Sequence, residues 1–226
     1  MLGDGSRYGI NLEYLVQERP DGIAQSFILG ENFIGNDNVA LILGDNLFYG
    51  KNFKDLLIKT VSKSIGATIF ATKVDDPNKF GVVTFNEDNI ATSIIEKPKK
   101  PLSNYAVTGL YFYDNNVVEI AKTLTPSSRG ELEITDINNI YLNNKELSVQ
   151  KLESEFIWLD CGTYDSLLSS SQYVKSIQEQ LDVKIGCLEE IAYDNDWISD
   201  NDLEFAITKH KNADYGKYLR NIYGNK

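Results

Sequence analysis

Two aspartates each follow a short apolar run, in a position where a strand would end. Asp45 stands in Leu-Gly-Asp-Asn after the run at 39–43, and Asp160 stands in Trp-Leu-Asp-Cys after an apolar stretch at 156–159. Open α/β sheets bind their ligands at the carboxyl ends of strands, so both carboxylates are well placed for a site. Together they can hold one Mg²⁺, whose other ligands would be phosphate oxygens and water. The alternative for Asp45 is that it caps the next turn.

Two further segments carry groups suited to a sugar phosphate and to a base. Glu96 and Lys97 follow the predicted strand at 90–95. There a carboxylate can accept from sugar hydroxyls and an ammonium group can pair with phosphate, although a solvated ion pair is the alternative. Gln17 carries an amide that can pair with a pyrimidine imide edge, and Gly22 opens a helix whose backbone N–H groups could face the base. A plain loop and helix start is the alternative for that segment.

Composition argues against several other sites and partners. The formal net charge of −11 speaks against a nucleic-acid partner, which needs a basic face. Cys161 and Cys187 form no C-x-x-C pair and are expected to be reduced, and the lone His210 gives no zinc site. No apolar run reaches the roughly 18 residues that span a bilayer, and the first residues lack the features of a secretory signal. We therefore expect a cytoplasmic protein without a membrane partner.

Apolar runs alternate with amphipathic helical patterns along the chain. Strands are predicted at 39–43, 67–74, 81–85, 90–95, 105–113, 147–152 and 156–159. Helices are predicted after Asp21 and at 53–63, 117–124, 134–142, 164–177, 200–210 and 214–222. This succession predicts a Rossmann-like α/β fold with a mixed, mostly parallel central sheet, in which 39–43 is a buried parallel strand. We expect one domain over residues 1–226, with 187–226 as its helical carboxyl-terminal extension.

Eight segments resemble, in their order and spacing, the sugar nucleotidyltransferase family. They are 2–6, 17 with 20–25, 43–46, 80–83, 96–98, 104–114, 129–136, and 158–160 with 162–163. Each segment alone is a weak indication of the family, whereas eight segments in the same order are a specific one. Together they extend over the whole chain. The resemblance is to the short, homotetrameric bacterial branch of the family that transfers thymidylyl groups.

This resemblance implies a reaction and its ligands. A phosphate oxygen of glucose 1-phosphate would attack the α-phosphorus of dTTP and release pyrophosphate, giving dTDP-glucose for dTDP-rhamnose and cell-surface polysaccharide synthesis. No general base is needed, because a phosphate monoester is largely ionised at neutral pH. The implied ligand-binding residues are Asp45 and Asp160 for Mg²⁺, Asn46 beside the metal-bound phosphates, Gln17 and Gly22 for thymine, and Gly81, Glu96, Lys97, Val107 and Tyr111 for glucose 1-phosphate.

Three departures from the family pattern limit what is implied. The family opens with a glycine-rich loop that bears an Arg and is followed by a Lys, and this sequence begins after both. We therefore assign no catalytic residue and expect residues 1–226 by themselves to be weak or inactive. Phe80 stands where the branch usually has Tyr, and the arginines of the inhibitor site are absent near Ser154 and Asp194. The alternatives are a non-catalytic sugar-nucleotide-binding remnant and a uridylyl- or cytidylyltransferase.

Overall fold

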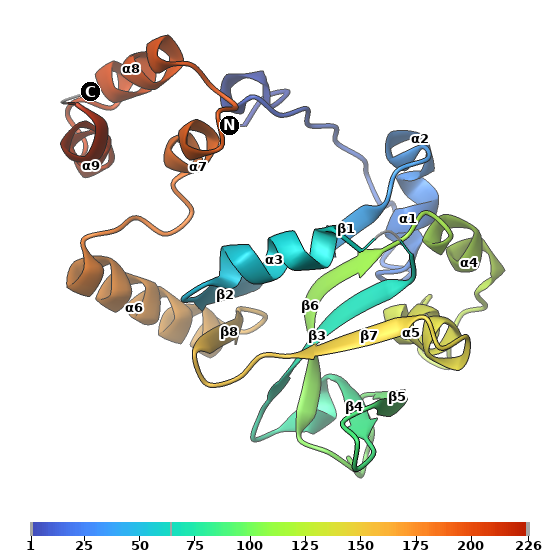
Figure 1. The fold of residues 1–226 in the computed structure, drawn as a ribbon. Coiled ribbons are helices and arrows are strands. Elements are labelled where there is room, and N and C mark those ends of the chain that lie inside the picture. The colour runs from blue at the N-terminus through green and yellow to red at the C-terminus, as the bar shows by residue number, and fades with distance from the viewer. Residues whose placement is uncertain (1, 64, 225–226) are drawn as a thin grey trace. The chain divides into compact units, whose positions relative to one another are not determined.

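The computed structural model describes residues 2–63 and 65–224, which form two compact units. One unit spans residues 15–167, and the other joins the residues up to Tyr14 to those from Leu168 onward. The strands all belong to the first unit, whereas the second is built from helices (Figure 1). A single domain with a helical extension from residue 187 stays a prediction.

The larger unit is organised around a six-stranded sheet. Its strands are β1 Val39–Ile42, β3 Ala67–Lys73, β4 Gly81–Phe85, β5 Ala91–Glu96, β6 Tyr105–Tyr113 and β7 Leu147–Lys151. They lie in the order β5-β4-β6-β3-β7, and β1 pairs with the carboxyl half of β6. The long strand β6 is therefore central, with β3 along one edge and both β4 and β1 along the other.

The α/β class and the mixed sheet are as predicted, but the proportion of parallel pairs is not. Among the described strands only β3 and β7 run parallel, and the other pairs are antiparallel. The prediction of a buried parallel strand at 39–43 is wrong, because β1 runs antiparallel to β6 and exposes Ala40 and Ile42. A short apolar run fits either orientation, since its pattern does not report the direction of its partner.

A second sheet joins two segments that are distant in the sequence. It consists of β2 Asn46–Gly50 and β8 Phe156–Asp160, which run antiparallel and pair Asn46 with Asp160. The predictions omit β2, whose residues are all half-buried and show no alternation of apolar and polar side chains. This pairing places the turn before β2 next to the end of β8.

Helices cover both faces of the main sheet. Those of the larger unit are α1 Gln25–Leu29, α2 Glu31–Ile34, α3 Phe53–Val61, α4 Val117–Thr123 and α5 Ile134–Asn143. Side chains alternate across a strand, so Ile69 of β3 packs with α1, α4 and α5 while its neighbour Phe70 packs with α3. Figure 1 accordingly shows α3 and the pair α4 and α5 on opposite sides of β3 and β6. The helices predicted at 53–63, 117–124 and 134–142 are confirmed.

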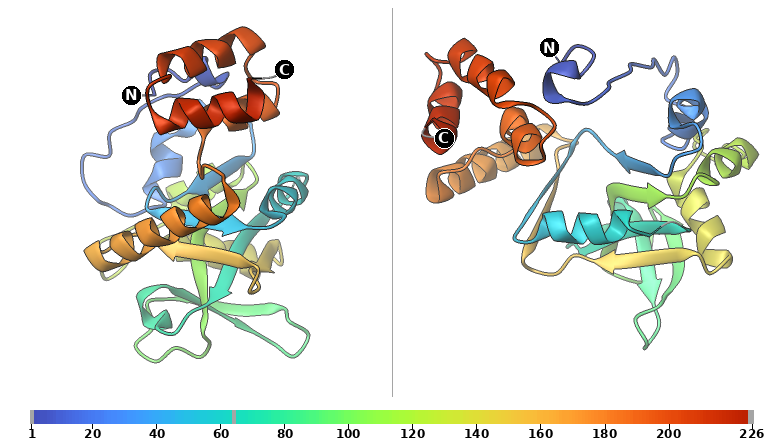
Figure 2. Two further views of the ribbon diagram at one scale, coloured as in Figure 1. Left: turned by 90° about the vertical axis from the view of Figure 1, so that its left-hand side faces the viewer. Right: turned by 45° about the horizontal axis from the view of Figure 1, so that its top comes forward.

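The smaller unit is helical. It contains the short turn η1 Ser6–Tyr8, most of α6 Tyr164–Leu181, and the helices α7 Leu188–Asp194, α8 Asp200–Lys209 and α9 Asp214–Tyr223. Its core is formed by Cys187, Leu203, Tyr218 and Leu219. Figure 2 shows η1 beside these helices, where Arg7 Nη2 donates to Glu189 Oε1 at 3.0 Å. The helices predicted at 200–210 and 214–222 are confirmed.

Neither cysteine takes part in a disulfide. Cys161 is half-buried and Cys187 is buried, and both are free thiols. Within the described residues, no group of three or more His, Cys, Asp or Glu side chains could hold a metal ion by itself. No helix in this part of the chain has the length and apolar character needed to cross a membrane.

Candidate functional site

Side chains from both sheets line a cavity of about 200 Å³ in the larger unit. The lining residues are Ile23, Leu43, Asp45, Asn46, Lys79, Phe80, Gly81, Glu96, Lys97, Val107, Gly109, Tyr111, Ile134, Thr135, Trp158 and Asp160. Eight of the ten predicted ligand-binding residues are among them. The two that are not are Gln17 and Gly22.

The two aspartates border the same small space beside Gly162. Asp45 lies in the turn between β1 and β2, and Asp160 is the last residue of β8. The backbone N–H of Cys161 donates to the carbonyl of Asp45 at 2.8 Å, which ties the two segments together. A Cβ atom on Gly162 would lie 3.5 Å from Asp160 Oδ1 and 3.7 Å from Asp45 Oδ2. The missing side chain at residue 162 therefore leaves room between the carboxylates.

The electrostatics of this acidic pair favour a cation. Burial, and then the negative charge of Asp45, raise the pKa of Asp160 above its ordinary value, and the backbone N–H of Gly162 and the charge of Lys97 oppose this only in part. The cavity is lined by three carboxylates, including Glu96, against two ammonium groups. A phosphate-bearing ligand would add negative charge, which a divalent cation would offset. Two carboxylates beside open space fit Mg²⁺, because Mg²⁺ keeps water and phosphate oxygens as its other ligands.

Asn46 directly follows Asp45 and also lines the cavity. Its Oδ1 accepts from the backbone N–H of Gly109 at 2.9 Å and from Trp158 Nε1 at 2.5 Å. Its Nδ2 donates to Asp45 Oδ1 at 2.8 Å. The side chain thus connects β2, β6 and β8 at the acidic end of the cavity.

A second polar group is built around Glu96, the last residue of β5. Thr135 Oγ1 donates to Glu96 Oε2 at 2.6 Å, and Thr135 itself is only 4% exposed. A Cβ atom on Gly81 would meet Thr135 Oγ1 at 3.2 Å and Glu96 Oε2 at 3.3 Å. Glycine at 81 therefore keeps this pair accessible from the cavity. The pKa of Tyr111 is raised, first by burial and then by the charge of Glu96.

Lys97 is held in an unusual backbone conformation at the rim of the cavity. Its φ of 41° is left-handed, a conformation that costs energy for a residue with a side chain. Its backbone N–H donates to the carbonyl of Phe80 at 3.0 Å, which secures the turn. The ring of Phe80 packs edge-on against Trp158, with centroids 5.1 Å apart. Strain of this kind often marks a site where side-chain placement matters.

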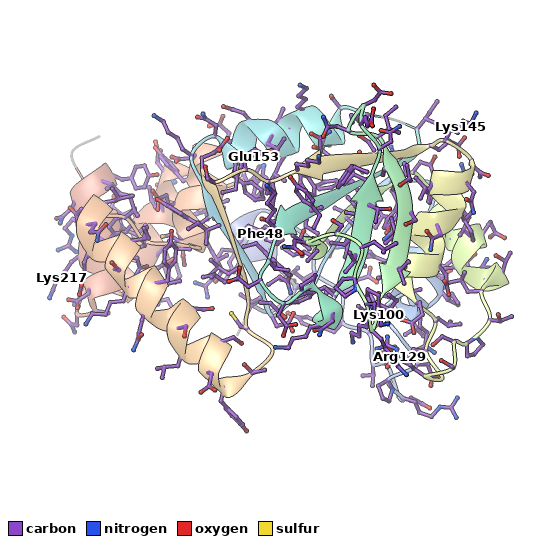
Figure 3. The ribbon with its side chains drawn as sticks, turned by 90° about the horizontal axis from the view of Figure 1, so that it is seen from below. Phe48, Lys100, Arg129, Lys145, Glu153 and Lys217 are labelled. Atoms are coloured by element: carbon purple, nitrogen blue, oxygen red, sulfur yellow. The ribbon has the colours of Figure 1, made fainter. Side chains whose placement is uncertain are left out.

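Arg129, which is labelled in Figure 3, binds carboxylates of the segment that also carries Thr135. Its guanidinium donates to both carboxylate oxygens of Glu133, at 3.0 and 2.7 Å, and its Nη2 lies 3.8 Å from Glu96 Oε1. Burial alone would raise the pKa of Glu133, but the hydrogen bonds from Arg129 and Ser127 outweigh it and hold that pKa low. Arg129 is therefore largely engaged with carboxylates.

The segment expected to bind the base adjoins the cavity, but Gln17 and Gly22 are not among the residues that line it. Gln17 Nε2 donates to the carbonyl of Gly22 at 3.1 Å and to Gln25 Oε1 at 2.6 Å. Gly22 has a φ of 105°, and a side chain there would collide with the backbone of Leu132. The next residue, Ile23, does line the cavity. The thymine-binding role of Gln17 and Gly22 stays a prediction.

Sequence reasoning gave no role to Thr135 or Trp158, and for Gly109 it suggested the close approach of a ligand or a bulge. Thr135 lies in the segment 129–136, which carries the family resemblance, but nothing in its neighbours indicates the bond to Glu96. Trp158 precedes Asp160 by two residues and points to Asn46, a contact across the second sheet. Gly109 was recognisable as a glycine within a strand, which indicates a close backbone approach. The group that approaches it is the side chain of Asn46.

Sequence comparison places the chain among known proteins. It matches the family model for nucleotidyl transferase over residues 1–177. A glucose-1-phosphate thymidylyltransferase of Neisseria meningitidis is 55% identical over 220 residues, which are 97% of this chain and 76% of that protein. The protein of the same name from Mycobacterium tuberculosis H37Rv is 47% identical over 219 residues, 97% of this chain and 76% of that protein.

Solved structures agree with the sequence relatives. A crystal structure described as a glucose-1-phosphate thymidylyltransferase of Bacillus anthracis superposes with a TM-score of 0.72 at 39% identity, over 84% of this chain and 73% of that one. A UDP-glucose pyrophosphorylase in complex with UDP-glucose gives a TM-score of 0.63 at 25% identity, over 73% and 66% of the two chains. The chain therefore belongs to the nucleotidyl transferase family and, within it, to the glucose-1-phosphate thymidylyltransferases.

Proposed function

We propose that the enzyme to which residues 1–226 belong transfers a thymidylyl group from dTTP to glucose 1-phosphate, giving dTDP-glucose and pyrophosphate, with Mg²⁺ as its cofactor. The observation that carries the proposal is one cavity that combines the acidic pair Asp45 and Asp160 with Glu96 and Lys97. Relatives named for this activity, at up to 55% identity, support the choice of nucleotide and sugar.

The acidic pair would hold the cation. Asp45 Oδ2 and Asp160 Oδ1 border the space beside Gly162, so they are the oxygens best placed to bind it. When bound, Mg²⁺ would supply positive charge to the triphosphate oxygens as the α-phosphorus is attacked. The repulsion that raises the pKa of Asp160 would be relieved at the same time, because the cation attracts both carboxylates.

The other polar groups would hold the sugar phosphate. Lys97 offers an ammonium group near enough to the acidic pair to affect the pKa of Asp160, which suits a phosphate lying between them. Glu96, fixed by Thr135, would accept from sugar hydroxyls. Gly81, Val107 and Tyr111 would form the wall around the ring. The attacking phosphate oxygen is already ionised, so these residues act by positioning it and by stabilising charge.

The base would lie beside the segment from Gln17 to Gln25. Ile23 of this segment reaches the cavity. Gln17 already uses its amide nitrogen within the segment, so its Oε1 is the atom proposed to accept from the N–H of the thymine imide. We also propose, from the family resemblance, that the protein is a cytoplasmic homotetramer whose product supplies dTDP-rhamnose synthesis.

The experiment is a nucleotide comparison. Pyrophosphate release would be measured with glucose 1-phosphate, Mg²⁺ and dTTP, UTP or CTP at equal concentration, together with binding of dTDP-glucose by calorimetry. The proposal expects the fastest release with dTTP and none after chelation of Mg²⁺. A preference for UTP would instead support the uridylyltransferase alternative. Binding without turnover, under conditions in which the Neisseria meningitidis relative is active, would support the binding-only alternative.

A further inference from the structure

We propose that Asn46 is a positioning residue whose amide orients the carboxylate of Asp45 toward Asp160. The inference rests on the proposed function, because the orientation matters for the cation that this acidic pair would hold. Asn46 would not bind the cation itself; it would decide which oxygen of Asp45 faces it.

The orientation of the Asn46 amide is fixed by its partners. An indole N–H and a backbone N–H can only donate hydrogen bonds, and both Trp158 Nε1 and the Gly109 N–H point to the same atom of Asn46. That atom must be the oxygen, because the amide nitrogen is itself a donor. The nitrogen therefore faces Asp45. In a flipped amide, the NH2 group of Asn46 would face the N–H donors of Gly109 and Trp158.

Because the nitrogen of Asn46 is fixed, the two oxygens of Asp45 have different surroundings. Nδ2 donates to Asp45 Oδ1 at 2.8 Å. The other oxygen, Oδ2, is the one that borders the space beside Gly162, which Asp160 also borders. Asn46 thus engages one oxygen of Asp45 and leaves the second for a ligand. Partners of this kind commonly set the orientation of metal-binding groups.

The surroundings of Asn46 leave its side chain little freedom. A Cβ atom on Gly109 would lie 2.5 Å from Asn46 Oδ1 and 2.8 Å from Leu43 Cγ, so only glycine allows β6 to approach this closely. On the other side, Trp158 is backed by the ring of Phe80. The amide is therefore anchored from β6 and from β8, and its remaining contact is with Asp45.

The same contacts argue against a direct role of Asn46 in binding the cation. Mg²⁺ binds oxygen ligands, and both lone pairs of Asn46 Oδ1 are already used by N–H donors. Its Nδ2 cannot bind a cation and has only one N–H group left after the bond to Asp45. Any effect of Asn46 on the cation must therefore pass through Asp45.

The test is cation binding in the absence of nucleotide. Binding of Mn²⁺ would be measured by electron paramagnetic resonance for the wild type, Asn46→Ala and Trp158→Phe. Loss of an orienting partner typically weakens metal affinity about 10–100-fold, and this loss is expected for Asn46→Ala. Trp158→Phe is the matched control, because it removes one anchor but keeps the bond from Asn46 to Asp45. It is expected to bind Mn²⁺ nearly as the wild type does.

The outcomes separate this inference from the proposed function. If Asp160→Asn also binds Mn²⁺ as tightly as the wild type, the proposed cation site is wrong. If Asp160→Asn loses binding while Asn46→Ala retains it, only the positioning role is overturned. Equal losses in Asn46→Ala and Trp158→Phe would show that Asn46 acts through general packing, which also overturns the inference.

A second variant covers the case in which Asn46→Ala does not fold. Asn46→Asp keeps an acceptor for Gly109 and Trp158, but it replaces the donated N–H with an oxygen facing Asp45. In a crystal structure at pH 8, the carboxylate of Asp45 should turn away from residue 46. An Asp45 carboxylate that keeps its orientation would contradict the positioning role.

Discussion

Two groups of carboxylates in the larger unit differ in how their oxygens are satisfied. Asp114, directly after β6, is 6% exposed and is surrounded by donors: Gly66 N–H at 2.8 Å and Tyr141 OH at 2.6 Å. At the cavity, Asp160 instead faces a second carboxylate, and its pKa is raised by burial and by Asp45. The fold supplies the donors at the first site, whereas at the second we propose that a cation completes the pair.

The smaller unit contains a buried carboxylate whose oxygens are satisfied by donors, as those of Asp114 are. Glu189 is 3% exposed, and its two oxygens accept separately from Arg7 and from the hydroxyl of Tyr215. Buried charges are tolerated where such partners are present. In contrast to Asp114 and Glu189, Asp160 faces a second carboxylate, that of Asp45. Substitutions at both kinds of site test this difference.

Asp160→Asn should reduce Mg²⁺-dependent turnover by at least about 10²-fold, the size of effect seen when one group that stabilises transition-state charge is removed. The reason is that an amide is a poorer ligand for a hard cation than a carboxylate. Steady-state pyrophosphate release at saturating Mg²⁺ measures this. Glu153→Gln removes an exposed carboxylate that does not line the cavity, and it is the control that should leave turnover unchanged. Equal activity of the two variants would refute the role of Asp160.

Asp114→Ala should destabilise the fold by about 3 kcal/mol or more, because it leaves at least two buried donors without their charged acceptor. Urea unfolding measures the change. Asp114→Asn keeps one acceptor oxygen and should lose less. A loss of stability below about 1 kcal/mol for Asp114→Ala would mean that the hydrogen bonds to this carboxylate do not hold the fold together.

Thr135→Val should lower kcat/KM for glucose 1-phosphate about tenfold, because a hydrogen bond to a charged group contributes roughly 1.5 kcal/mol or more. The change should appear in KM for the sugar phosphate and not in KM for dTTP, since Glu96 is expected to hold the sugar. Thr135→Ser restores the hydroxyl and should recover most of the loss. Equal effects on both substrates would indicate general damage to the cavity.

The smallest expected effect is on stability without a cation. Because the folded-state pKa of Asp160 is raised, its ionisation costs stability as the pH rises from the unfolded-state value, about 3.9, through the folded-state value. Asp160→Asn should therefore have a higher Tm than the wild type at pH 7, and the difference should vanish below about pH 4. Thermal scans with a chelator test this. A lower Tm for the variant at pH 7 would contradict the sign of the pKa shift.

The sequence predicted the parts of the site that lie at strand ends. Asp45, Glu96 and Asp160 each follow an apolar run, and strand ends are where α/β folds collect ligand-binding groups. Local patterns also located most of the helices, because a 3.6-residue apolar period is visible within one segment. Those features require no knowledge of what a segment pairs with.

The parts that were missed all depend on pairing between distant segments. The antiparallel placement of β1, the pairing of β2 with β8, and the bond from Thr135 to Glu96 each join positions whose own neighbours carry no sign of the contact. Asn46 was expected beside phosphates, but its anchors on Gly109 and Trp158 emerge only from the folded chain. Residue type predicted the chemistry, whereas the orientation of each group required the structure.

We propose above that Asp45 and Asp160 share one divalent cation. The most direct test of this proposal is anomalous scattering from crystals of the protein soaked in Mn²⁺ near neutral pH. We expect a single strong peak beside Gly162, within about 2.3 Å of one oxygen of each aspartate. A peak bound to only one of them, or a strong peak elsewhere with none at this position, would contradict it.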